Sequence, residues 1–138
     1  MTKTSKKAIV MLMMLMVSVN VFAAKIVVDQ PTNDTYAQQK SDTEWDLIKE
    51  DEELGYKVAT MLDIIATENL SEDFSRKFVK AVDEFNKAND SFNEYKHVLW
   101  DVEDGKLPAN AYSQRVFIYR FNQVAHNFNK VLKLFKNR

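Results

Sequence analysis

The fold is decided by residues 72–104, EDFSRKFVKAVDEFNKANDSFNEYKHVLWDVED. Apolar residues recur there at alternating steps of four and three, which places nine side chains on one stripe of an α-helix. The stripe consists of Phe74, Phe78, Ala81, Phe85, Ala88, Phe92, Tyr95, Leu99 and Val102. Ser71 precedes the stretch as an N-cap, and Glu72 and Asp73 suit the positive end of the helix dipole. The pattern predicts one amphipathic helix about 50 Å long, at 1.5 Å per residue.

A second long helix is predicted from about Ala109 to Asn137. Gly105 suits the left-handed backbone position that ends a helix, and Pro108 suits the first turn of the next one. The apolar stripe continues with the same spacing and is widened by three neighbours; its members are Phe117, Phe121, Val124, Phe128, Val131 and Phe135, with Ile118, Ala125 and Leu132. Because the connection is short, the two helices are expected to pack as an antiparallel hairpin.

An earlier helix is predicted to begin at Ser41, because Ser41 and Glu44 have the spacing of a capping box. Its apolar residues lie mostly three or four apart: Trp45, Leu47, Ile48, Leu54, Val58, Met61, Leu62 and Ile65. The acidic run at 50–53 interrupts this pattern and Gly55 weakens it, so the sequence leaves open whether the helix is continuous or breaks or bends there. Residues 41–138 therefore predict an all-α, up-down-up three-helix bundle. The alternative is a long hairpin on which the first helix docks loosely.

The start of the chain predicts export from a bacterial cell. Residues 1–23 have the basic head, short apolar run and small residues of a cleaved signal peptide, with cleavage expected before Ala24. The apolar run, residues 8–17, is shorter than the ~20 residues that a membrane span needs, so no stable span is expected after cleavage, and a retained anchor is the alternative. Residues 24–40 are polar and contain Pro31, which predicts a flexible leader. The expected location is the periplasm or the exterior.

Charge is divided unevenly along the exported part of the chain. Residues 25–68 carry 4 basic and 11 acidic side chains, residues 69–105 carry 5 and 9, and residues 106–138 carry 7 and none. Two interpretations remain open. The basic helix can be neutralised by the acids of its neighbours, or it can expose a basic strip to an anionic partner. The strip would comprise Arg115, Arg120, Lys130, Lys133 and Lys136.

Several kinds of chemistry are disfavoured by the composition. The chain of 138 residues has no Cys and two Gly, which excludes thiolate sites and leaves no glycine-rich phosphate loop. No catalytic constellation is recognised, so we expect neither an enzyme nor a resident cofactor. His97 and His126 are predicted to face solvent. Glu94, His97 and Asp101 lie three and four residues apart and are the candidates for a surface metal contact.

A second stripe on the last helix supplies the candidate binding residues. Tyr112, Val116 and Tyr119 are spaced by four and three, on the side opposite Phe121, and Arg115 flanks them. Such a face is typical of a protein interface, although the first turns of the helix could instead be buried. The predicted partner-binding residues are Tyr112, Arg115, Val116, Tyr119, Arg120, Lys130 and Lys133.

The sequence thus favours an exported bacterial protein that acts without catalysis, by binding another macromolecule as an inhibitor, immunity protein, chaperone or adaptor does. The expected partner is an envelope or extracellular protein, or an anionic surface polymer. Nucleic acid is disfavoured by export and by the acidic remainder of the chain. A carrier that binds metal or a small ligand is the alternative function. The oligomeric state is not predicted.

Overall fold

The computed structural model describes residues 43–138, so the predicted signal peptide and leader lie outside the described part of the chain. The described residues form three α-helices: α3 (Trp45–Thr67), α4 (Glu72–Glu103) and α5 (Gln114–Lys136). A short 3-10 helix, η2 (Ala109–Ala111), lies between α4 and α5. None of the helices in this part is long and apolar enough to cross a membrane.

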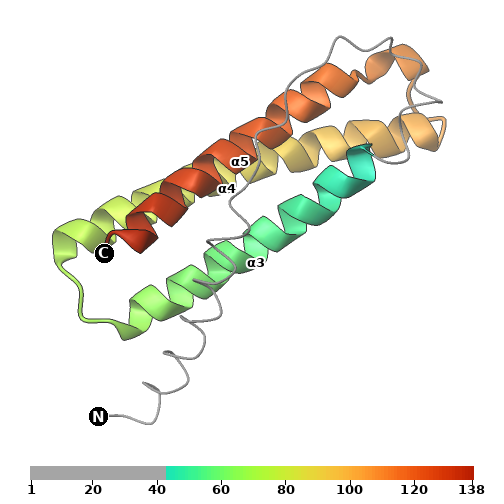
Figure 1. Cartoon of the computed structure of the whole chain (residues 1–138). Helices are drawn as coiled ribbons and strands as arrows, with labels where there is room; N and C mark the ends of the chain where they lie inside the picture. Colours follow the sequence, from blue (N-terminus) through green and yellow to red (C-terminus); the bar gives the residue numbers. More distant parts are fainter. Residues whose placement is uncertain (1–42) are drawn as a thin grey trace.

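The chain reverses direction twice, so that α4 runs antiparallel to α3 and α5 (Figure 1). The most extensive packing joins α4 to α5, and α3 packs on α5 more than on α4. The predicted all-α bundle of three packed helices is therefore confirmed. Its centre is a long α4–α5 hairpin, and α3 lies along one side of that hairpin.

Aromatic pairs run along the seam between α4 and α5. Phe92 packs edge-on against Phe117, at 4.9 Å between ring centroids, and against Phe121, at 5.8 Å. Farther along, Phe85 meets Phe128 edge-on at 6.3 Å. These rings are between 0% and 2% exposed, so the predicted stripes of both helices are the core. Edge-to-face contacts of this kind add to the burial of apolar area that holds the hairpin together.

Both ends of α4 lie where the sequence predicts them. The Ser71 hydroxyl accepts a hydrogen bond from the Phe74 backbone N–H, at 3.1 Å, which satisfies one of the free donors of the first turn. After the last turn, Gly105 has a φ of +75°, a conformation that glycine adopts without steric cost. The predicted cap and the predicted stop are confirmed.

The start of α5 differs from the prediction of Ala109. Pro108 leads into η2 instead, and Tyr112 and Ser113 then have extended backbones, so the α-helix begins only at Gln114. The Ser113 backbone N–H donates to the Tyr95 hydroxyl at 2.7 Å, which ties this junction to α4. Helical spacing therefore does not hold across residues 109–113.

The sequence leaves open whether the first helix breaks at its acidic run, and the structure shows a continuous helix from Trp45 to Thr67. Gly55 lies within this helix and packs against no other element, since a Cβ placed there would have no atom within 4 Å. Within the acidic run, Glu52 and Glu53 are exposed while Asp51 is buried and paired. Trp45, predicted on the apolar stripe, is 51% exposed, and Ile64 is buried in addition to the predicted set.

Candidate partner-binding face

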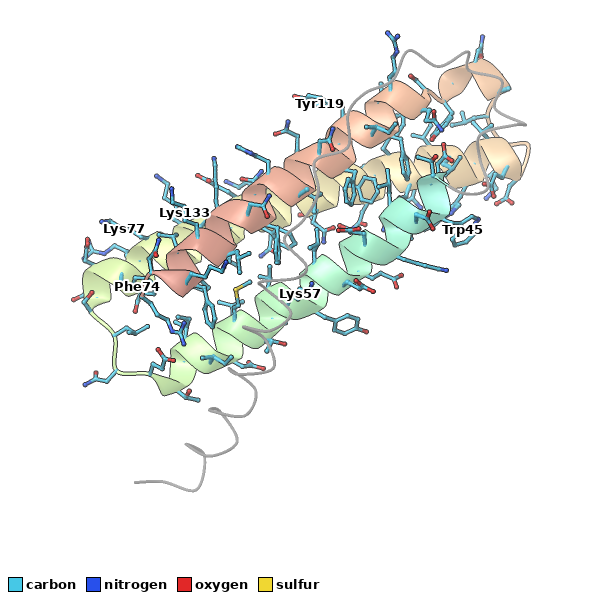
Figure 2. The ribbon with its side chains drawn as sticks, viewed as in Figure 1. Trp45, Lys57, Phe74, Lys77, Tyr119 and Lys133 are labelled. Atoms are coloured by element: carbon cyan, nitrogen blue, oxygen red, sulfur yellow. The ribbon has the colours of Figure 1, made fainter. Side chains whose placement is uncertain are left out.

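Five polar or aromatic residues define what we call the outer face of α5: Arg115, Tyr119, His126, Lys130 and Lys133. Their spacing places them on the side of the helix opposite the buried Phe121 and Phe128. Tyr119 is 62% exposed, and Figure 2 shows both Tyr119 and Lys133 pointing away from the bundle. From residue 115 to residue 133 the face is about 27 Å long, at 1.5 Å per residue.

Three cations of this face form no ion pair with the described part of the chain. Helix α5 carries five cationic side chains and no acid. No acid among residues 43–138 lies within ion-pair distance of Arg115, Lys130 or Lys133. The outer face therefore presents positive charge at its two ends, Arg115 at one and Lys130 and Lys133 at the other, and the exposed Tyr119 lies between them.

An open depression of about 370 Å³ lies beside the C-terminal half of the outer face. The residues of the described chain that line it belong to α5 and the position after it: Asn129, Leu132, Lys133, Lys136 and Asn137. Two of them are lysines in the last turn, where positive charge also complements the negative end of the helix dipole. The depression extends the cationic surface towards the end of the chain.

Arg120, which the sequence assigned to the basic strip, lies instead on the seam between α5 and α4. Its guanidinium donates to the Ser91 carbonyl at 2.9 Å and approaches the Glu94 carboxylate at 3.9 Å. The same group lies over the Tyr95 ring, 5.1 Å from its centroid. Arg120 thus joins two helices, and its charge is shared with α4. The charge of Arg138 is likewise paired, because its guanidinium donates through two nitrogens to the Glu68 carboxylate, at 2.8 and 2.9 Å.

Tyr112, which the sequence placed on an outward stripe with Val116 and Tyr119, is buried. Only 9% of it is exposed, and its hydroxyl donates to Glu44 Oε1 at 2.9 Å. Its ring stacks on Tyr95, with 5.6 Å between centroids. The cause is the late start of α5, since Tyr112 precedes the helix and does not share its periodicity. Val116 is 36% exposed and borders the outer face.

The Glu44 carboxylate forms the centre of a buried polar cluster that the sequence analysis did not predict. Besides Tyr112, the Gln114 side-chain amide donates to Glu44 Oε1 at 3.0 Å, while Oε2 has no hydrogen-bond partner. Glu44 is 2% exposed and Gln114 is 5% exposed. The capping box predicted for Glu44 involves Ser41, which lies outside the described residues. The Glu44 carboxylate connects the start of α3 to the junction before α5.

A second buried polar contact joins the middle of α3 to α4. Lys96 Nζ lies 3.6 Å from Asp51 Oδ2, and the two side chains are 11% and 5% exposed. With its amide nitrogen turned towards Asp51, Asn89 donates to both carboxylate oxygens, at 2.7 and 3.0 Å. Burial raises the pKa of the Asp51 carboxyl from 3.8 to about 6, against the lowering effect of the Lys96 charge. This pair holds α3 against α4.

A signal for both clusters was present in the sequence. Glu44 and Asp51 complete the regular three-and-four spacing of the α3 stripe, which reads Glu44, Leu47, Asp51, Leu54, Val58, Met61 and Ile65. Gln114 likewise lies three residues before Phe117 on the α5 stripe. An acid or amide at such a core position indicates a buried polar partner, because burying it alone is costly.

The metal candidates are not brought together. Glu94 and His97 are exposed, and the His97 ring packs edge-on against Trp100, with 5.2 Å between centroids. Among residues 43–138 no group of three or more histidine or acidic side chains is placed to hold a metal ion. His97 and His126 both face solvent, as predicted.

Comparison with known proteins adds no relative, since no family model, curated protein or solved structure matches the chain. The geometry of the described residues is therefore what bears on function.

Proposed function

We propose that this protein is exported and acts without catalysis, by binding an acidic protein of the envelope or exterior through the outer face of α5. One observation carries the proposal: a largely exposed tyrosine lies on a helix face whose cations have no acidic partner among the described residues.

Two halves of the face have different roles in this proposal. Tyr119, Arg115 and Val116 form the contact itself, because tyrosine and arginine are enriched at the energetic centres of protein interfaces. Lys130 and Lys133 lie farther along the helix and guide an acidic partner by long-range attraction, which raises the association rate more than the affinity. The exposed tyrosine favours a protein over a purely anionic polymer, for which charge alone suffices.

The test is affinity capture from envelope extracts with three immobilised baits. The first is the wild-type protein, and the second carries Tyr119→Ser, Lys130→Gln and Lys133→Gln. The third is a matched control on α4, Val79→Ser with Lys80→Gln and Lys87→Gln, which removes one exposed apolar residue and two exposed cations elsewhere. We expect a partner that binds wild type and control alike.

The α5 variant should lose that partner, since truncating one interface tyrosine commonly costs ~2 kcal/mol, or about 30-fold in affinity. Equal capture by all three baits would contradict the proposal. Recovery of a polysaccharide or lipid in place of a protein would replace the proposed partner class with an anionic polymer.

A further inference from the structure

A second face of the bundle matches the outer face of α5 in length and is opposite to it in charge. We define the outer face of α3 by its solvent-facing residues, Trp45, Lys49, Glu52, Glu53, Tyr56 and Asp63. Trp45 is 51% exposed and Tyr56 is 76% exposed, although large aromatic rings are usually well covered. The face carries three acids and one lysine, whereas the outer face of α5 carries cations and no acid.

We propose that these two faces bind each other between copies of this chain, the outer face of α5 on one copy docking on the outer face of α3 on a second copy. The inference rests on the proposed function, because it names the partner of the same α5 face. Residues 45–63 and residues 115–133 span the same number of helical steps, about 27 Å each. The surfaces used by the two copies differ, so the interface is heterologous and leads to rings or open chains.

A parallel alignment of the two helices gives the better match of residues. If Trp45 lies opposite Arg115, then Lys49 lies opposite Tyr119 and Asp63 lies opposite Lys133. Three cations then meet an aromatic ring or an acid, while Lys130 lies opposite Thr60. An antiparallel alignment brings Lys49 close to Lys130 instead. Because these side chains are exposed in the single chain, each contact is weak, and we expect association that needs high protein concentration and low salt.

The test uses charge reversal on each face separately. One variant carries Arg115→Glu, Lys130→Glu and Lys133→Glu, and the other carries Glu52→Lys, Glu53→Lys and Asp63→Lys. All six side chains are exposed and lie away from the core, and the far-ultraviolet circular dichroism of each variant is compared with wild type to establish that it folds. Tyr119→Ser, which changes no charge, is the second probe of the α5 face.

Sedimentation velocity at protein concentrations from about 10 to about 500 µM then tests the proposal. This concentration range detects association with dissociation constants in the micromolar range and above. Wild type should associate at low salt and dissociate at high salt, each reversed variant alone should be monomeric, and Tyr119→Ser should associate more weakly. A mixture of the two reversed variants should associate again, because the unchanged acidic α3 face of the first variant meets the unchanged basic α5 face of the second, and the two reversed faces are also opposite in charge.

A monomeric wild type at low salt would overturn the inference, and so would an equimolar mixture that stays monomeric. If this occurs while affinity capture still depends on Tyr119, Lys130 and Lys133, the proposed function stands and its partner is another protein. If neither self-association nor capture depends on these residues, both proposals fail.

Discussion

Replacing Lys96 with methionine should destabilise the bundle by about 3 kcal/mol at neutral pH, because it leaves the Asp51 carboxylate buried without its cation. The pair is separated by 3.6 Å and both side chains are nearly covered. At an effective dielectric constant of about 20, the attraction lost at that distance is roughly 4 to 5 kcal/mol. The two hydrogen bonds from Asn89 remain and offset part of the loss.

Replacing both partners at once should be nearly neutral. The double variant Asp51→Leu with Lys96→Met removes the cost of burying two charges together with their attraction, so its stability should lie within about 1 kcal/mol of wild type. Urea unfolding followed by circular dichroism gives each free energy of unfolding. Lys80→Met, at an exposed lysine on the same helix, is the matched control and should change stability by less than about 0.5 kcal/mol. A Lys96→Met loss below about 1 kcal/mol, or a double variant as unstable as the single one, would refute this reasoning.

Three further predictions concern the core and its polar contacts. The pKa of the Asp51 carboxyl is about 6 in the folded chain against an ordinary 3.8, so the folded state binds this proton more tightly than the unfolded state does. The free energy of unfolding should therefore rise by up to ~3 kcal/mol as pH falls from about 7 to about 4, and this increment should disappear as pH rises through 6. Urea unfolding across this pH range should show that the increment is absent from Asp51→Asn. Phe85→Ala and Phe128→Ala should each cost about 3 to 5 kcal/mol in the same assay, since both rings are at most 2% exposed, and a loss below ~1 kcal/mol would mean that this seam is not the core. Tyr112→Phe should lower the melting temperature by removing the buried hydrogen bond to Glu44, at a cost of about 1 to 3 kcal/mol, while Tyr119→Phe should leave it unchanged; equal effects would place both tyrosines in the same environment.

The α4–α5 hairpin could be predicted because its sequence is regular. Apolar residues recur at regular spacing from Phe74 to Val102 and from Phe117 to Phe135. Because an apolar stripe of this length is stable only when it is buried, the two stripes are expected to pack against each other. The cap at Ser71 and the stop at Gly105 are local features, and each depends on residues within one turn. The exposed positions of Tyr119, Lys130 and Lys133 follow from the same periodicity.

The differences from the sequence prediction have two physical origins. A polar core residue is stable only through a partner distant in the sequence, and helical spacing does not hold for residues outside a helix. Asp51 seemed to interrupt α3 because its partners, Asn89 and Lys96, lie on another helix. Tyr112 was placed on an outward stripe because helical spacing was extended into η2 and the extended residues after it. Its contact with Glu44 joins residues 68 positions apart, and no local pattern identifies Tyr112 as the partner of that carboxylate.

Lysine labelling of the protein in the free state and in complex with its captured envelope partner tests the central proposal most directly. An amine-reactive reagent followed by mass spectrometry measures the accessibility of each lysine. We predict that binding protects Lys130 and Lys133 several-fold, while Lys77, Lys80 and Lys87 on α4 are labelled as in the free protein. Protection of the α4 lysines with unchanged labelling of Lys130 and Lys133 would contradict the assignment of the outer face of α5 as the binding surface.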